Sequence, residues 1–127
     1  MKGLLDTHVL IWWLTDDGHL ADRAKDFIAD RDNELFFSSA GVWEIVIKTR
    51  LKRVKFPVDP NFLNEQLVLN HIQSLPIHMN HVINLHKIIW HHNDPFDHIM
   101  ISQAQCENLT FLTADKLIKK YKVNILW

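Results

Sequence analysis

The sequence has few of the features that mark a secreted or membrane-spanning protein. Cys106 is its single cysteine, so no disulfide can form within the chain. A lone cysteine suits a reducing cytoplasm, and we expect Cys106 to be a small buried residue on a helix rather than a nucleophile. No apolar run approaches the roughly 20 residues that span a bilayer. Asp6 also comes too early for a signal peptide. We therefore expect a cytoplasmic protein with no part in a membrane.

Zinc-binding motifs and a large excess of positive charge are absent as well. The chain has nine histidines, but it contains no H-E-x-x-H and no cysteine pair, so a zinc site is not indicated. The net charge of −1 excludes a globally basic nucleic-acid-binding protein. The charge is uneven, however, because residues 48–55 hold five basic residues and no acid. This segment predicts either contact with a phosphate backbone or a solvated helix end.

What is present is an alternation of strand-like and helix-like segments along 127 residues, a length typical of one domain. Short apolar runs predict strands at residues 2–5, 34–38, 74–78, 109–113 and 123–126. Helical spacing of apolar residues predicts helices at 7–14, 19–30, 38–51, from 62 onward, at 82–89, from 94 onward and at 116–121. The chain has no repeats, no low-complexity segment and no linker. This pattern predicts one α/β domain over residues 1–127, with a central parallel sheet flanked by helices.

Four carboxylates, Asp6, Glu44, Asp97 and Asp115, lie at or near the ends of these predicted elements. Asp6 and Asp115 follow predicted strands, and ligands of parallel sheets bind beyond the carboxyl ends of strands. Glu44 lies in an apolar helical run, where an acid is costly unless it is neutralised, and Lys48 four residues later offers an ion pair. If the fold gathers these acids into one cleft, their repulsion requires a cation. Oxygen ligands of this kind suit Mg²⁺ or Mn²⁺.

Each of the aspartates also has an ordinary structural explanation. Asp6 and Asp115 can cap the helices that follow them. Asp97 falls where the acid of a capping box sits, behind Asp94 as the N-cap and Pro95 as the first helical residue. Spacing alone does not decide between capping and convergence on a metal.

Several separated motifs occur in a fixed order along the chain. They are Leu4-Leu5-Asp6-Thr7-His8 with Trp12-Trp13, Trp43-Glu44-Ile45 before Lys48, His92-Asn93-Asp94-Pro95-Phe96-Asp97, Gln103-Ala104, Leu112-Thr113-Ala114-Asp115 and Leu126-Trp127. In these motifs, and over essentially its whole length, the sequence resembles the PIN-domain ribonuclease toxins of bacterial type II toxin–antitoxin systems, the VapC-like branch. The resemblance implies a PIN-like fold. It also implies a Mg²⁺- or Mn²⁺-dependent endoribonuclease that hydrolyses RNA phosphodiester bonds with metal-activated water.

The resemblance also implies a role for individual positions. The catalytic and metal-binding acids would be Asp6, Glu44, Asp97 and Asp115. The supporting residues would be Thr7, Asp94, His98 and Thr113. Of these, Asp94 is expected to act as an N-cap beside the ligands, and His98 stands where many relatives have arginine, so we expect it near the phosphate when protonated. Candidate RNA-binding residues are Lys48, Arg50, Lys52 and Arg53. The family further implies a cognate antitoxin protein as partner and a homodimer.

Two other functions are compatible with the same residues. A non-catalytic PIN-like module would bind RNA or a partner protein without needing metal and would give no cleavage product. A metal-dependent DNA nuclease or phosphatase would use the same acids on a different substrate. Assays on single-stranded RNA, DNA and a phosphomonoester distinguish these possibilities.

Overall fold

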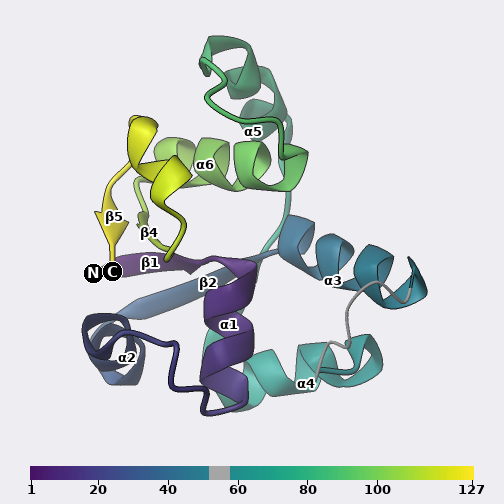
Figure 1. Cartoon of the computed structure of the whole chain (residues 1–127), viewed down its shortest axis with the longest axis vertical. Helices are drawn as coiled ribbons and strands as arrows, with labels where there is room; N and C mark the ends of the chain where they lie inside the picture. Colours follow the sequence, from purple (N-terminus) through teal and green to yellow (C-terminus); the bar gives the residue numbers. More distant parts are fainter. Residues whose placement is uncertain (52–57) are drawn as a thin grey trace.

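The fold is built on a parallel sheet of five strands, seen in a computed structural model that describes residues 1–51 and 58–127 (Figure 1). The strands are β1 (Lys2–Leu5), β2 (Glu34–Ser38), β3 (Ile72–Leu75), β4 (Thr110–Leu112) and β5 (Ile125–Leu126). Their order across the sheet is β3-β2-β1-β4-β5, and every neighbouring pair is parallel. The predicted α/β architecture is confirmed, and all the carboxyl ends of the strands lie at one edge.

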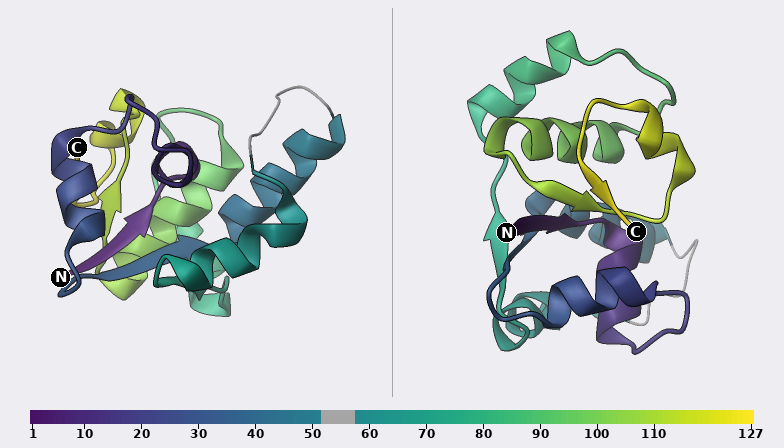
Figure 2. Two further views of the ribbon diagram at one scale, coloured as in Figure 1. Left: turned by 90° about the horizontal axis from the view of Figure 1, so that it is seen from below. Right: turned by 90° about the vertical axis from the view of Figure 1, so that its left-hand side faces the viewer.

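Helices cover both faces of this sheet. The α-helices are α1 (Thr7–Leu14), α2 (Asp22–Ala29), α3 (Ser39–Leu51), α4 (Pro60–Leu69), α5 (Met79–Asn84) and α6 (Pro95–Glu107). The 3₁₀-helices are η1 (Leu85–Lys87) and η2 (Lys116–Lys120). Helices α5 and α6 lie on one side of the strands, and α1 and α2 on the other, in both Figure 1 and the right-hand view of Figure 2. Within the described part of the chain, no helix is long and apolar enough to cross a membrane.

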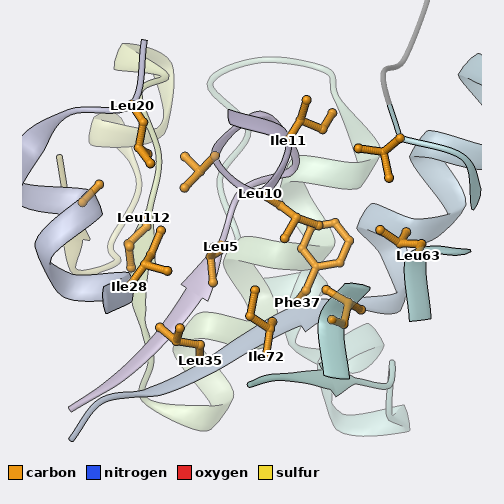
Figure 3. Packing of buried hydrophobic residues seen from close by; sticks show 14 of the residues in the cluster. Leu5, Leu10, Ile11, Leu20, Ile28, Leu35, Phe37, Leu63, Ile72 and Leu112 are labelled. Carbon is orange, nitrogen blue, oxygen red and sulfur yellow. The ribbon is translucent and has the colours of Figure 1, made fainter. Parts of the chain in front are cut away.

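The sheet has a separate hydrophobic core on each face, because side chains alternate between the two faces along each strand. Leu5 and Leu112 belong to the cluster that packs against α1, α2 and α4 (Figure 3). Their chain neighbours Leu4 and Phe111 belong to the cluster on the opposite face, together with Met100 of α6 and other residues. Successive strand residues point to opposite faces, so a sheet covered on both sides needs apolar residues at consecutive positions. This requirement explains the short continuous apolar runs in the sequence.

A glycine allows α3 to begin directly behind β2. A Cβ atom added to Gly41 would lie 2.4 Å from Cζ of Phe37, a fully buried ring at the end of β2. No real side chain fits at that distance. The glycine therefore lets the first turn of α3 pack on β2, and it sets the position of Glu44 one turn later.

Several predicted boundaries were wrong. The strand predicted at 74–78 runs instead from Ile72 to Leu75, because His71 adopts a positive φ of 57° and turns the chain into β3 early. The helix predicted over 82–89 ends as α5 at Asn84 and continues only as η1, and the last strand is shorter than predicted. Cys106 lies on α6 as predicted, but it is exposed rather than buried.

Candidate functional site

The four predicted acids line a single cleft of about 350 Å³ at the carboxyl edge of the sheet. Asp6 follows β1, Glu44 lies in α3, Asp97 is in the first turn of α6, and Asp115 lies between β4 and η2. Strand order alone predicted the edge position of Asp6 and Asp115, and the structure adds Glu44 and Asp97. The other residues that line the cleft are His8, Trp12, Lys48, Asp94 and Ala114.

Asp6 is held by two short hydrogen bonds at the centre of this edge. Its Oδ1 accepts from the backbone N–H of Thr7 at 2.7 Å. Asp6 therefore caps α1, which was the ordinary structural role expected for it. Its Oδ2 accepts from the hydroxyl of Thr113 at 2.7 Å. Leu5 pairs with Leu112 in the sheet, so Asp6 and Thr113 are the next facing positions. Burial raises the pKa of Asp6 above its usual value, and the hydrogen bond from Thr113 opposes this rise.

Glu44 has both of its carboxylate oxygens occupied by neighbours. Oε1 accepts from the Thr7 hydroxyl at 2.7 Å, and Oε2 lies 2.7 Å from the ammonium of Lys48. The ion pair with Lys48, which the spacing of the two residues offered as an alternative role for Glu44, is therefore present. Glu44 is nevertheless only 5% exposed and faces the cleft, so it is not an ordinary surface partner. A buried acid of this kind requires neutralisation, which Lys48 supplies in part.

Asp97 does not act as a capping-box acid. Asp94 caps α6 by accepting from the backbone N–H of Phe96 at 2.9 Å, as predicted. The Oδ2 of Asp97 instead lies 2.8 Å from His92 Nε2. Burial raises the pKa of Asp97 to about 7, the negative charge of Asp6 adds to this rise, and the hydrogen bond with His92 opposes it. A cation bound in the cleft would favour the charged form of Asp97 and would therefore lower its pKa again.

Asp115 has a capping role and also faces the cleft. Its Oδ1 accepts from the backbone N–H of Leu117 at 2.9 Å, at the start of η2. Its own backbone N–H donates to the hydroxyl of Thr113 at 3.1 Å. The hydroxyl of Thr113 therefore contacts the segment that carries Asp115 while it donates to Asp6. The two predicted hydroxyls, Thr7 and Thr113, are both buried and both bind acids of the cleft.

His98 lies outside the cleft that holds the four acids. The residue is 3% exposed, its Nε2 is 2.7 Å from the carbonyl oxygen of His92, and its ring packs against Trp90. It is not among the residues that line the cleft. Successive helical residues point about 100° apart, so His98 cannot share the direction of Asp97. The expectation that His98 contacts a phosphate in this cleft is therefore wrong for this structure.

The predicted basic residues divide into three groups. Lys48 lines the cleft beside Glu44, and Arg50 is exposed in the last turn of α3. Lys52 and Arg53 lie outside the described residues.

Three residues of the site were missed as candidates when the sequence was read alone. His8 and Trp12 line the cleft, since both lie on α1 immediately after Asp6. His92 binds Asp97 from the loop before α6. The signal for His92 was its position within the motif that contains Asp97, but a contact across a loop has no fixed spacing.

The donor set matches a hard divalent cation, because the four acids offer only oxygen ligands. Among the described residues, however, no three side chains of the His, Cys, Asp and Glu types are already arranged around one ion position. Mg²⁺ commonly keeps several water ligands and takes only one or two carboxylates from the protein. The acids of this cleft therefore fit a hydrated ion better than a fully protein-enclosed one.

Trp12 also lines a larger cleft of about 680 Å³. Its acids are Asp16, Asp17 and Asp22, from a single stretch of chain after α1. It contains none of the acids from the strand ends. The smaller cleft is the better candidate because it gathers buried acids from separate elements.

Comparison with known proteins agrees with this fold. The PIN domain family model matches residues 3–124. The chain resembles a chain of DNA-bound VapBC from Salmonella typhimurium, with 15% identity, a TM-score of 0.71 and coverage of 99% of this chain and 97% of that one. It also resembles a chain of VapBC2 from Rickettsia felis bound to a promoter DNA fragment (14%, 0.70, 99% and 98%). A chain of FitAcB from Neisseria gonorrhoeae is similar as well (18%, 0.63, 100% and 97%). No curated protein matches in sequence.

Proposed function

The chain belongs to the PIN domain family, and we propose that it is a divalent-metal-dependent endoribonuclease, the toxin of a type II toxin–antitoxin pair. The observation that carries this proposal is the meeting of Asp6, Glu44, Asp97 and Asp115 in one cleft. They come from four separate segments, and the outermost two, Asp6 and Asp115, are 109 positions apart in the sequence. Capping and a local ion pair explain some of the individual contacts. They do not explain why buried acids are gathered at one edge.

The four acids are proposed to hold Mg²⁺ or Mn²⁺ through their oxygens and through water. A bound ion of this kind lowers the pKa of water and offsets the charge that develops on a phosphodiester. The chain's own residues prepare the site. Thr7 and Thr113 fix the orientation of Glu44 and Asp6 through hydrogen bonds of 2.7 Å. Lys48 keeps a positive charge at the edge of the cleft, next to Glu44.

RNA is the proposed substrate, and its backbone would be drawn to cations beside the cleft. Lys48 on α3 lines the cleft, and Lys116 is exposed at the start of η2, next to Asp115. Arg50 belongs to the proposed set as an exposed cation in the last turn of α3, outside the lining of the cleft. Lys52 and Arg53 belong to the same proposed set through their sequence position. These side chains would bind phosphates of any sequence, so they supply affinity rather than base specificity.

A cognate antitoxin is the proposed protein partner. The similar structures include VapBC complexes and a toxin–antitoxin complex from Klebsiella pneumoniae. We propose the same type of assembly for this chain, acting in the cytoplasm, with a homodimer of the PIN domain as its toxin part. Co-expression with the product of a small adjacent gene should suppress growth arrest and cleavage. Unchanged toxicity in the presence of that product would show that the pairing is wrong.

The enzymatic proposal is tested with purified protein on single-stranded RNA, single-stranded DNA and a phosphomonoester, each with Mg²⁺, Mn²⁺ or EDTA. We expect cleavage of RNA only, dependent on the metal and lost in Asp6→Asn and Asp97→Asn. Asp32→Asn, on an exposed turn far from the cleft, is a matched control and should be as active as the wild type. Undiminished cleavage by both cleft variants would contradict the proposal. Product from DNA or the phosphomonoester would support the alternative substrates, and metal-independent RNA binding without product would support a binding module.

A further inference from the structure

Two hydrogen bonds in series, through the ring of His92, connect Tyr121 to Asp97. The hydroxyl of Tyr121, just after η2, lies 2.7 Å from His92 Nδ1. On the other side of the same ring, His92 Nε2 lies 2.8 Å from Asp97 Oδ2. Tyr121 is buried, and it is the single tyrosine of the sequence. These two contacts join the segment after η2 to Asp97 in the first turn of α6.

The partners of Tyr121 fix the direction of these hydrogen bonds. Its oxygen accepts from the backbone N–H groups of His91 at 2.8 Å and His92 at 3.2 Å. His98 Nε2 is 3.3 Å away, but it lies 2.7 Å from the carbonyl oxygen of His92, which can only accept. His98 Nε2 must therefore carry a hydrogen. Of the partners around Tyr121, only His92 Nδ1 is then left to accept the hydroxyl hydrogen.

In this pattern of hydrogen bonds His92 Nδ1 is an acceptor, and the ring hydrogen lies on Nε2. That hydrogen is donated to Oδ2 of Asp97. Within the described residues, no hydrogen bond is found to Oδ1 of Asp97, and this residue lines the cleft. The arrangement leaves one oxygen of the carboxylate tied to the protein and the other available to a ligand.

We propose that Tyr121 and His92 are positioning residues that orient Asp97 for metal binding: Tyr121 sets the tautomer of His92, and His92 holds Oδ2 so that Oδ1 faces the cleft. The inference rests on the proposed function in one respect, the assignment of Asp97 as a metal ligand. Groups that orient a ligand in this way usually contribute about 10–100-fold to metal affinity or activity. Neither residue touches the substrate in this account.

The first test is spectroscopic and needs neither metal nor RNA. Side-chain ¹⁵N NMR of the metal-free wild type should show the hydrogen of His92 on Nε2 (the Nε2–H tautomer), with the signal assigned by its loss in His92→Gln. Tyr121→Phe removes the donor to Nδ1, so a measurable population of the Nδ1–H tautomer should appear. An Nδ1–H tautomer in the wild type, or no change in Tyr121→Phe, would overturn the inference.

The second test measures Mn²⁺ affinity by titration of the full chain. His92→Phe keeps a ring but loses the donor, and we expect roughly 10-fold weaker binding. His92→Gln keeps an N–H donor, so its Mn²⁺ affinity should lie between those of the wild type and His92→Phe. His91→Phe is the matched control, because the His91 ring packs on Tyr121 without contacting Asp97, and it should bind like the wild type.

The outcomes separate this inference from the proposed function. If the wild type binds Mn²⁺ and a folded His92→Phe variant binds it equally well, the positioning role is wrong while the metal site stands. If the wild type binds no Mn²⁺, the metal site itself is wrong. If His92→Phe does not fold, His92→Gln and the wild-type tautomer decide the question.

Discussion

The hydroxyl of Thr113 donates to Oδ2 of Asp6 at 2.7 Å, across 107 positions of sequence. The same hydroxyl accepts from the backbone N–H of Asp115 at 3.1 Å. One small side chain thus joins the ends of β1 and β4 and contacts two of the segments that bear acids. Because Thr113 is buried, removal of its hydroxyl would leave Oδ2 of Asp6 without this hydrogen bond.

Thr113→Val tests this relationship, because valine has nearly the shape of threonine but lacks the hydroxyl. Asp6 would lose a hydrogen bond that favours its charged form, so its pKa should rise further above the usual value. We expect metal-dependent cleavage to fall by about 10-fold and the free energy of unfolding by about 1–3 kcal/mol. Thr110→Val, three residues earlier on β4 and outside the cleft, is the control. Equal activity of the two variants would show that Thr113 has no special role.

Gly41→Ala tests the close approach of α3 to β2. The new Cβ would lie 2.4 Å from the buried ring of Phe37, so the ring or the helix must shift. We expect a loss of about 1–3 kcal/mol in the free energy of unfolding, measured with urea. Gly18→Ala is a matched control because its Cβ would meet nothing within 4 Å and its φ is not positive, so a change within about 0.5 kcal/mol is expected. A fully stable Gly41→Ala would contradict the packing described for α3.

The raised pKa of Asp97 predicts how stability depends on pH in the presence of EDTA. The folded protein holds a proton on Asp97 up to a pH of about 7, whereas the ordinary value is 3.8. Between these values the folded state binds more protons than the unfolded state, so this group lowers stability as the pH rises. Above a pH of about 7 its effect levels off.

Asp97→Asn removes this titration and keeps an oxygen that can accept from His92. In thermal unfolding with EDTA at pH 5, 6, 7 and 8, the variant should gain stability relative to the wild type as the pH rises. A difference of about 2–4 °C in Tm corresponds to about 1 kcal/mol for a protein of this size. A difference between the two proteins that does not vary with pH would contradict the raised pKa.

Much of the fold was predictable because strands and helices here follow local rules. The strand Glu34–Ser38 and the helix Thr7–Leu14 have the predicted bounds. The early start of β3 was not predicted, because the turn before it uses a positive φ at His71, which the pattern of apolar residues does not reveal. The exposure of Cys106 likewise depends on what packs beside α6, which periodicity does not specify.

The candidate site divides in the same way. Asp6 and Asp115 could be placed at one edge because parallel strands end together. Placing Glu44 and Asp97 required the family resemblance, since a helix pattern does not say what its polar residues face. The contacts of His92 join a loop to Tyr121 in the C-terminal segment and to Asp97 in α6, and only the folded structure brings these residues together. The expectation that His98 contacts a phosphate failed for the same reason, because a helix pattern does not say what its polar residues face.

The most direct test of the central claim is a crystal structure with Mn²⁺, in which anomalous scattering locates the ion. We predict one or more peaks in the cleft, within roughly 2.0–2.6 Å of oxygens from Asp6 or Asp97 or bridged to them by water. The peaks should be absent in crystals of Asp6→Asn. Strong peaks elsewhere with none in the cleft, or cleft peaks that persist unchanged in Asp6→Asn, would contradict the account.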